Sequence, residues 1–185
     1  MEVEMSAEAK DKRLNSLVAL TVVVLSIFMG LAGVKDGNLV QSMQQEQASS
    51  IDLWNEYQAT RIKRHVDEVA LNQLGLSANP NPAAQAEKKR LTDEMAKYDK
   101  EAPELKKKAT DASAQYDALN YHDDQFDAAD ALISIGVAVA AVAALAENWA
   151  ALFVAWFFGG FGMIMGVCGF FNLPFHLDWL AKLLS

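Results

Sequence analysis

The sequence predicts an all-α membrane protein with three transmembrane helices and a long antiparallel helical hairpin, a coiled-coil-like stalk, between the first and second. Two observations lead to this fold class. Three long runs carry no Asp, Glu, Lys or Arg, whereas the segment 35–127 between the first two carries 17 acidic and 12 basic side chains. A single turn signal divides that polar segment. This block pattern excludes a soluble enzyme with one core and a disulfide-linked secreted domain.

The N-terminal part predicts a membrane anchor. Residues 1–13 form a charged tail that includes Lys10, Lys12 and Arg13, and residues 14–34 follow as 21 uncharged residues rich in Leu, Val and Ile. A helix of about 20 apolar residues spans the core of a bilayer. Basic residues before the first span favour a cytoplasmic N-terminus. The polar segment is therefore expected on the opposite, periplasm-like side.

Residues 35–127 predict two long helices joined by one turn. The stretch at about 75–82 combines a helix-ending Gly with Asn-Pro turn signals. It leaves arms at about 38–74 and 83–127, each about 60 Å long at 1.5 Å per residue. Equal arms return the chain to the membrane, as an antiparallel stalk requires. Pro103 is expected to kink or restart the second arm because proline lacks an N–H.

Apolar residues of the second arm recur in alternating steps of four and three, the spacing of a heptad seam. The seam consists of Leu91, Met95, Tyr98, Ala102, Leu105, Ala109, Ala112, Tyr116, Leu119, the one polar member Asp123, and Phe126. In the first arm Val40, Ile51 and Ile62 instead recur every 11 residues, a period that favours straighter or right-handed packing. A single hairpin buries little surface for its length, so the chain is expected to form a homo-oligomer.

Trp54, Tyr57 and Gln58 lie at positions i, i+3 and i+4 and therefore share one face of the first arm. They predict a seam between the arms or between subunits. The alternative is a recognition patch for a partner protein.

Residues 128–146 and 150–171 predict the second and third membrane helices, joined by a tight turn at Glu147 to Trp149. The uncharged part of the second run spans only about 24 Å, so a buried soluble helix is its alternative. The segment 172–185 is expected to lie at the membrane interface as an amphipathic helix, or else to extend the third helix.

Gly162 and Gly166, four residues apart in the third run, form a pattern that favours close helix contact. Gly136 and Ala140 offer a matching small face on the second run. The pattern predicts packing within the membrane hairpin or an interface between subunits.

Asp123, Asp127 and Asp130 share one helix face just before the second membrane run. In an oligomer they would form an acidic ring that concentrates cations at the mouth of a pore. Carboxylates also suit Ca²⁺. The third alternative is that they mark the point where the helix enters lipid.

Two segments resemble a known family. Residues 52–63 contain a Trp-x-x-Tyr-Gln-Ala motif, and residues 122–129 read His-Asp-Asp-Gln-Phe-Asp-Ala-Ala and run directly into an apolar helix. Both resemble the bacterial membrane family known as domain of unknown function 4337. The resemblance covers nearly the whole chain. It implies the membrane topology above in a bacterial inner membrane, and it implies no activity.

The sequence therefore predicts a non-enzymatic membrane protein, a self-assembling scaffold or an accessory subunit that uses its stalk as the interaction surface. The alternative is a homo-oligomeric channel with the acidic ring at its mouth. No catalytic residue, cofactor or metal site is expected, because no known motif or metal-ligand spacing occurs. The expected partners are the lipid bilayer, further copies of the chain and a partner membrane protein. A net charge of −8 without a basic face excludes nucleic acid.

Overall fold

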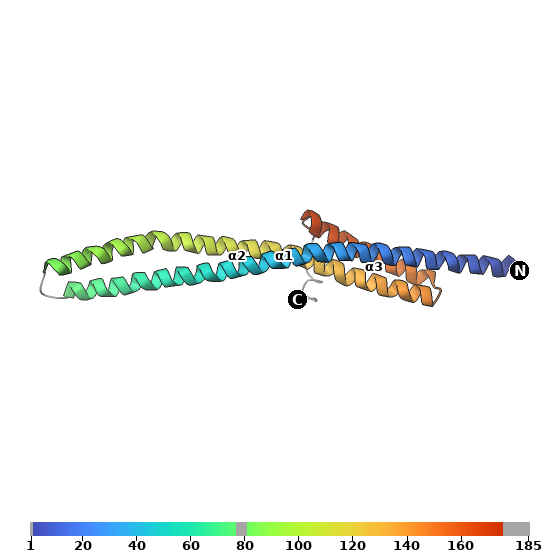
Figure 1. The fold of residues 1–185 in the computed structure, drawn as a ribbon, viewed down its shortest axis with the longest axis horizontal. Helices are drawn as coiled ribbons and strands as arrows, with labels where there is room; N and C mark the ends of the chain where they lie inside the picture. Colours follow the sequence, from blue (N-terminus) through green and yellow to red (C-terminus); the bar gives the residue numbers. More distant parts are fainter. Residues whose placement is uncertain (1, 77–80, 176–185) are drawn as a thin grey trace. The chain divides into compact units, whose positions relative to one another are not determined.

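The structure, a computed structural model, describes residues 2–76 and 81–175, with side chains from Lys12 onward. The described residues form three helices, α1 (Glu2–Leu76), α2 (Pro82–Leu145) and α3 (Trp149–Phe171) (Figure 1). This confirms the all-α class. The chain divides into two compact units. We call Met1–Ser42 with Ala118–Ser185 the apolar unit and Met43–Asp117 the polar unit. The predicted interfacial helix falls largely outside the described residues, which end at Phe175.

The helices α1 and α2 are longer than the elements predicted from the sequence. α1 begins at Glu2, so residues 2–13 of the charged tail are helical, and the helix continues through residues 35–37 without a break. α2 likewise continues from the second arm through residue 128 into the apolar run. The sequence contains no proline at either boundary between apolar and polar residues. An existing helix extends readily through such points, because each added residue gains one backbone hydrogen bond.

The predicted restart of the second arm at Pro103 does not occur. Pro103 is exposed and lies inside α2, a single helix of 64 residues. Proline removes one backbone donor, and the hydrogen bonds of the long helix on both sides keep the segment helical.

Asparagine residues define three of the helix ends. Asn81 accepts a hydrogen bond from the backbone N–H of Ala84 at 2.6 Å, directly before Pro82 at the first position of α2. Asn148 accepts one from Ala150 at 2.8 Å and begins α3. Asn172 ends α3 with a positive φ of 52°, a conformation that Asn adopts more easily than most residues.

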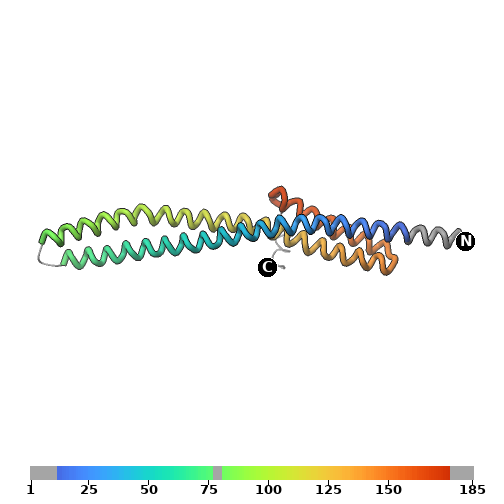
Figure 2. Tube along the Cα trace, viewed as in Figure 1, coloured from blue at the N-terminus to red at the C-terminus, as the bar shows by residue number. Residues whose placement is uncertain are grey.

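In the polar unit α1 and α2 pack together (Figure 2). The hydroxyl oxygens of Ser50 and Ser113 lie 2.8 Å apart. The guanidinium Nε of Arg64 donates to a carboxylate oxygen of Asp99 at 2.8 Å. Because side chains of α1 and α2 meet both at Ser50 and at Arg64, the contact between the helices extends along the two arms.

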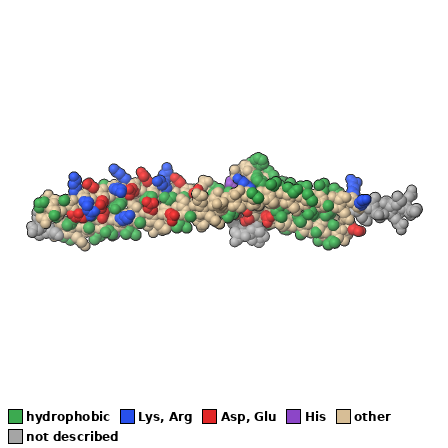
Figure 3. Space-filling view, in the orientation of Figure 1, with side chains coloured by type: hydrophobic (Ala, Val, Ile, Leu, Met, Phe, Trp, Pro, Cys, Tyr) green, Lys and Arg blue, Asp and Glu red, His purple; other side chains and the backbone are tan. Residues whose placement is uncertain are grey.

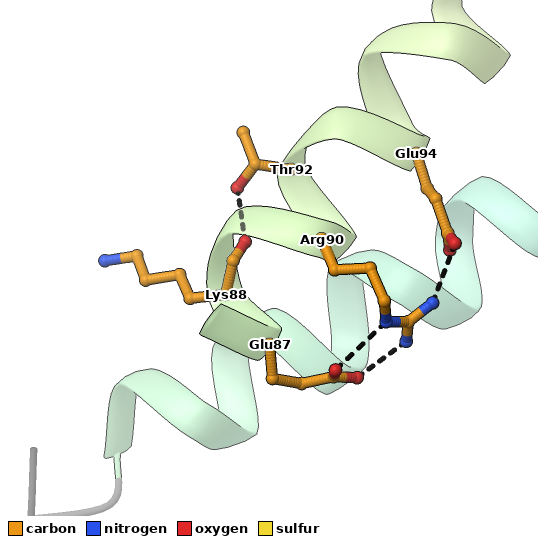
Figure 4. A network of polar contacts seen from close by, with 5 residues as sticks. All are labelled: Glu87, Lys88, Arg90, Thr92 and Glu94. Atoms are coloured by element: carbon orange, nitrogen blue, oxygen red, sulfur yellow. Dashed lines mark hydrogen bonds and ion pairs between the residues drawn. The ribbon is translucent and has the colours of Figure 1, made fainter. Parts of the chain in front are cut away.

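Ion pairs along the outside of α2 connect residues of the same helix. Arg90 contacts Glu87 at 2.6 Å and Glu94 at 2.7 Å (Figure 4). These pairs lie at spacings of three and four residues and are open to solvent, where such contacts contribute little. They support α2 locally and do not hold the two arms together.

In the apolar unit glycines allow the helices to approach closely. A Cβ atom on Gly136 of α2 would lie 2.9 Å from the backbone nitrogen of Gly159 in α3. A Cβ on Gly162 would lie 2.9 Å from the carbonyl oxygen of Ala129, and one on Gly166 would lie 2.6 Å from the ring of Phe28 in α1. Gly162 therefore faces α2 and Gly166 faces α1 of the same chain. These contacts agree with the alternative in which the glycines serve packing within one chain.

We expect Gly136→Ala to destabilise the apolar unit by about 1–3 kcal/mol, because its methyl group would meet backbone atoms that cannot move aside. Gly160→Ala is the matched control, since no atom lies within 4 Å of its added Cβ. This control should keep or slightly raise stability, because Ala favours helix more than Gly does. Thermal unfolding of the detergent-solubilised protein measures both. Equal melting temperatures for the two variants would contradict the close α2–α3 contact.

Candidate functional site

A cluster of carboxyl groups lies between α1 and α2 in the apolar unit. Asp36 of α1 and Asp123 of α2 lie within hydrogen-bonding reach of each other. One oxygen of each carboxyl is buried and has no hydrogen-bond partner among the described residues. Two carboxyl groups at this distance form a hydrogen bond only when one of them holds a proton. The pair is therefore a proton-sharing contact between the two helices.

A small cavity of about 200 Å³ adjoins this pair. Asp36, Asp127 and Asp130 supply its carboxylates, and Met29, Ala32, Gly33, Phe126 and Ile133 form its apolar wall. Asp127 and Asp130 are exposed, whereas Asp123 is half-buried. The cavity thus has an acidic side and an apolar side.

Burial and mutual repulsion raise the pKa values of Asp36, Asp123 and Asp127. Burial is the largest cause for Asp123, followed by the charges of Asp36 and Asp127, and together with the Asp36 contact they raise its pKa to about 7. Burial is also the main cause of the raised pKa values of Asp36 and Asp127. Asp123 therefore keeps its proton up to nearly neutral pH.

The sequence analysis found the three acids on α2 but missed Asp36. The only signal was the position of Asp36, two residues beyond the first uncharged run. The structure places Asp123 against Asp36 of the same chain, and it places Asp127 and Asp130 at the cavity beside Asp36, where both remain exposed. No group of three or more His, Cys, Asp or Glu among the described residues has a geometry suited to a metal ion.

Gln125 is a second polar residue that the sequence analysis missed. Its side chain is fully buried, and its amide nitrogen donates to the carbonyl oxygens of Leu173 and Phe175 beyond the end of α3. A ring nitrogen of His122 lies 3.1 Å from its side-chain oxygen. Because a buried amide needs such partners, Gln125 ties the chain after α3 to α2.

The predicted seam of the second arm faces α1 within the polar unit. Leu91 is 3% exposed, Ala109 is fully buried and Ala112 is 8% exposed. Met95, Tyr98 and Leu105 are half-buried. The small side chain of Ser113 lies beside Ala112 and reaches Ser50 across the contact. These residues therefore lie between the arms of one chain.

The predicted patch on the first arm is divided. The rings of Trp54 and Tyr57 are half-buried and meet edge to face, with centroids 5.6 Å apart. Gln58 is exposed. Ile51 and Ile62 are also exposed, at 55% and 64%, so the row with the 11-residue period lies outside the buried contact with α2, and Ile51 borders a cavity at its edge. The side of α1 that meets α2 is instead marked by Met43, which is 7% exposed, and Thr60, which is 4% exposed.

We expect the apolar unit to lose stability as the pH rises. The folded state keeps a proton on Asp123, whose pKa is about 7, over a range in which an ordinary carboxyl with a pKa of 3.8 has lost it. The contribution of this group to stability therefore falls between about pH 4 and pH 7 and stays low above that range. In detergent, Asp123→Asn should raise the melting temperature at pH 8 and flatten its pH dependence.

The control variant is Asp117→Asn, which removes the same charge from an exposed position on the same helix. It should keep the pH dependence of the unchanged protein. An Asp123→Asn variant that melts with the same pH dependence as the parent would contradict the proton-sharing contact.

Comparison with known proteins identifies a family for this chain, and the description of that family assigns no activity. The model of the family described as Domain of unknown function (DUF4337) matches residues 14–172. Neither the curated proteins nor the solved structures contain a match to the chain. The match includes both motif segments and all the acids of the carboxyl cluster. The chain therefore belongs to the DUF4337 family.

Proposed function

We propose that this chain is a non-enzymatic integral membrane protein that serves as a self-assembling scaffold or as an accessory subunit of a membrane complex. In this proposal α1, α2 and α3 each cross a bacterial inner membrane through their apolar segments. The polar unit forms an antiparallel helical hairpin on the periplasmic side, and its surface binds the partner. The N-terminus lies in the cytoplasm.

The outward-facing side chains of the apolar unit carry the proposal. All three helices contain stretches that are long and apolar enough to cross a membrane, judged by length and composition. Large hydrophobic side chains point outward from each of them, including Leu31, at 61%, Val142, at 56%, and Phe157, at 69% exposed. Figure 3 shows hydrophobic side chains covering these helices. Surfaces of this kind mark a contact with lipid or with another protein.

The polar unit supports a role in binding. Its charged side chains are spread over a long pair of helices (Figure 3). Ser50 contacts Ser113 and Arg64 contacts Asp99, so residues later in α1 meet residues earlier in α2, as in an antiparallel hairpin. Such a hairpin is about 50 Å long. Long paired helices supply extended surface for recognition, and the proposal assigns no reaction to the chain.

Site-specific labelling tests the topology. In a Cys168→Ala background, a membrane-impermeant maleimide added to intact spheroplasts should label Lys100→Cys in the polar unit and should not label Lys12→Cys before lysis. Val23→Cys, at a position that is 54% exposed in the apolar run of α1, should react only after denaturation. Labelling of Lys12→Cys alone would reverse the orientation. Rapid labelling of Val23→Cys would contradict the membrane span.

The mass of the complex tests the scaffold role. The protein, gently extracted from its own membranes, should run as an assembly larger than one 20.2 kDa chain, and mass spectrometry should identify its components. A protein found as single chains at all concentrations would contradict the scaffold and accessory roles together.

A channel is the second candidate, and the exposure of Asp127 and Asp130 favours it. Exposed acids on each copy can also line a shared opening in an oligomer. If the protein conducts ions in planar bilayers, Asp127→Asn should lower the preference for cations over anions, and Asp117→Asn should leave it unchanged. Unchanged selectivity in a conducting Asp127→Asn variant would contradict the acidic ring.

A further inference from the structure

One face of α1 in the polar unit is hydrophobic and exposed, and at its first member, Ile51, this face borders a small cavity that is also lined by Tyr116 and Asp117 of α2. Ile51, Ile62, Val66, Val69 and Leu76 are between 42% and 87% exposed. At 100° per residue these five positions lie within about 80° of one another around the helix. We call this face, from Gln44 to Leu76, the neutral stripe. Figure 3 shows hydrophobic side chains along the margin of the polar unit where Figure 1 places α1.

The neutral stripe contains no Asp, Glu, Lys or Arg side chain, and His65 lies at its edge. The segment of α1 in the polar unit contains eight Asp, Glu, Lys or Arg residues, and the helical repeat places all of them on other faces. Arg64 and Glu68, for example, lie on the side toward α2, where Arg64 meets Asp99. Between its apolar members the stripe carries neutral amides, including Asn55 and Gln58, which are both exposed.

We propose that the neutral stripe is the surface through which two copies of this chain pair side by side, in parallel and in register. This inference rests on the proposed function, because membrane spans with the same orientation hold two polar units parallel on the same side of the bilayer. The two copies are then related by a two-fold axis along the membrane normal. In that arrangement each residue on the axis meets its own counterpart.

The charge pattern favours a second copy over another partner. A charged residue on such an axis faces the same charge, which is destabilising, and the stripe avoids this along its whole length. A different protein would impose no such restriction, because an acidic position could meet a basic one. The chain as a whole carries a net charge of −8, so two copies repel each other unless an uncharged face is available.

The spacing and the amides also fit parallel pairing. Ile51, Asn55, Gln58 and Ile62 follow steps of four, three and four residues, which is the spacing of a coiled-coil seam. A polar Asn within such a seam bonds to its own counterpart and specifies register and a two-stranded state. Asn55 is placed to have this role between Ile51 and Ile62.

The available area is consistent with a membrane-anchored dimer. The stripe extends over about 50 Å of helix, and with a width of about 10 Å it offers about 500 Å² per copy. A total of about 1,000 Å² is the lower limit for a specific interface between freely diffusing proteins. Confinement to the membrane raises the effective concentration of the second copy, so an interface near this limit is sufficient.

Single cysteines test the pairing, because each stripe residue meets its own copy. In a Cys168→Ala background, mild oxidation of native membranes should convert Ile51→Cys, Ile62→Cys and Val69→Cys into disulfide-linked dimers. Lys63→Cys is the matched control, since it is exposed at the same height on a different face, and it should stay monomeric. Absence of dimers at all three stripe positions, or equal linkage at Lys63→Cys, would overturn the proposal. So would linkage of Ile62→Cys to a different protein.

Charge variants test the pairing without a covalent link. Ile62→Glu and Ile62→Lys, expressed separately, should each reduce the extracted complex to half its mass, because like charges would meet on the axis. Their co-expression should restore the full mass, whereas Lys63→Glu should not change it. Unchanged mass in Ile62→Glu would overturn the proposal. Extraction with alkaline carbonate distinguishes failure of the proposed membrane spans from failure of the proposed pairing. Release of the protein from the membrane would contradict the spans. A protein that stays in the membrane but forms no dimers would contradict only the pairing.

Discussion

The close approach of α2 and α3 is the contact on which the apolar unit depends. These helices have few polar side chains with which to hold one another, and in the proposed membrane setting the hydrophobic effect does not drive helices together. Gly136, Gly159 and Gly162 bring the two backbones near enough for dense van der Waals contact. The turn after Leu145 is short enough to keep the helices adjacent. α1 then joins through Leu25, against Gly159, and Phe28, against Gly166.

Polar contacts in this unit lie at its ends and edges. The indole N–H of Trp156 donates to the hydroxyl of Thr21 at 2.8 Å and links α3 to α1. Gln125 anchors the chain that follows α3. The carboxyl pair of Asp36 and Asp123 contributes an α1–α2 contact that depends on a proton. Protonation replaces repulsion between two acids with a hydrogen bond, so the stability of this region depends on pH as well as on packing.

The fold class was predictable because its signals are compositional. Uncharged runs, the Asn-Pro turn and the seam from Leu91 to Ala112 are properties of neighbouring residues, and the all-α class follows from them. The length of the helices was not predictable in the same way. A change from apolar to polar side chains marks a change of environment, but the backbone hydrogen bonds of an α-helix are indifferent to it. α1 and α2 therefore continue through residues 35–37 and 128.

The carboxyl cluster shows the limit of sequence reasoning more clearly. Asp123, Asp127 and Asp130 share a face of one helix and can be found by spacing alone, whereas Asp36 is 87 positions before Asp123 in the chain. Their contact depends on how α1 and α2 align, which no local pattern encodes. The same limit explains Ile51 and Ile62. An 11-residue repeat shows that two residues share a face, but it does not show whether that face meets α2.

The two faces of α1 in the polar unit follow different chemical rules. Toward α2, the helix uses small or polar groups, such as Ser50 and Thr60, and charged groups that find opposite charges, such as Arg64. This works because two different segments face each other and complementary residues can be placed opposite one another. On the neutral stripe, Asp, Glu, Lys and Arg are absent and aliphatic residues remain exposed. A face that has to match itself cannot use complementary charges, and neutral side chains are the residues that satisfy this constraint.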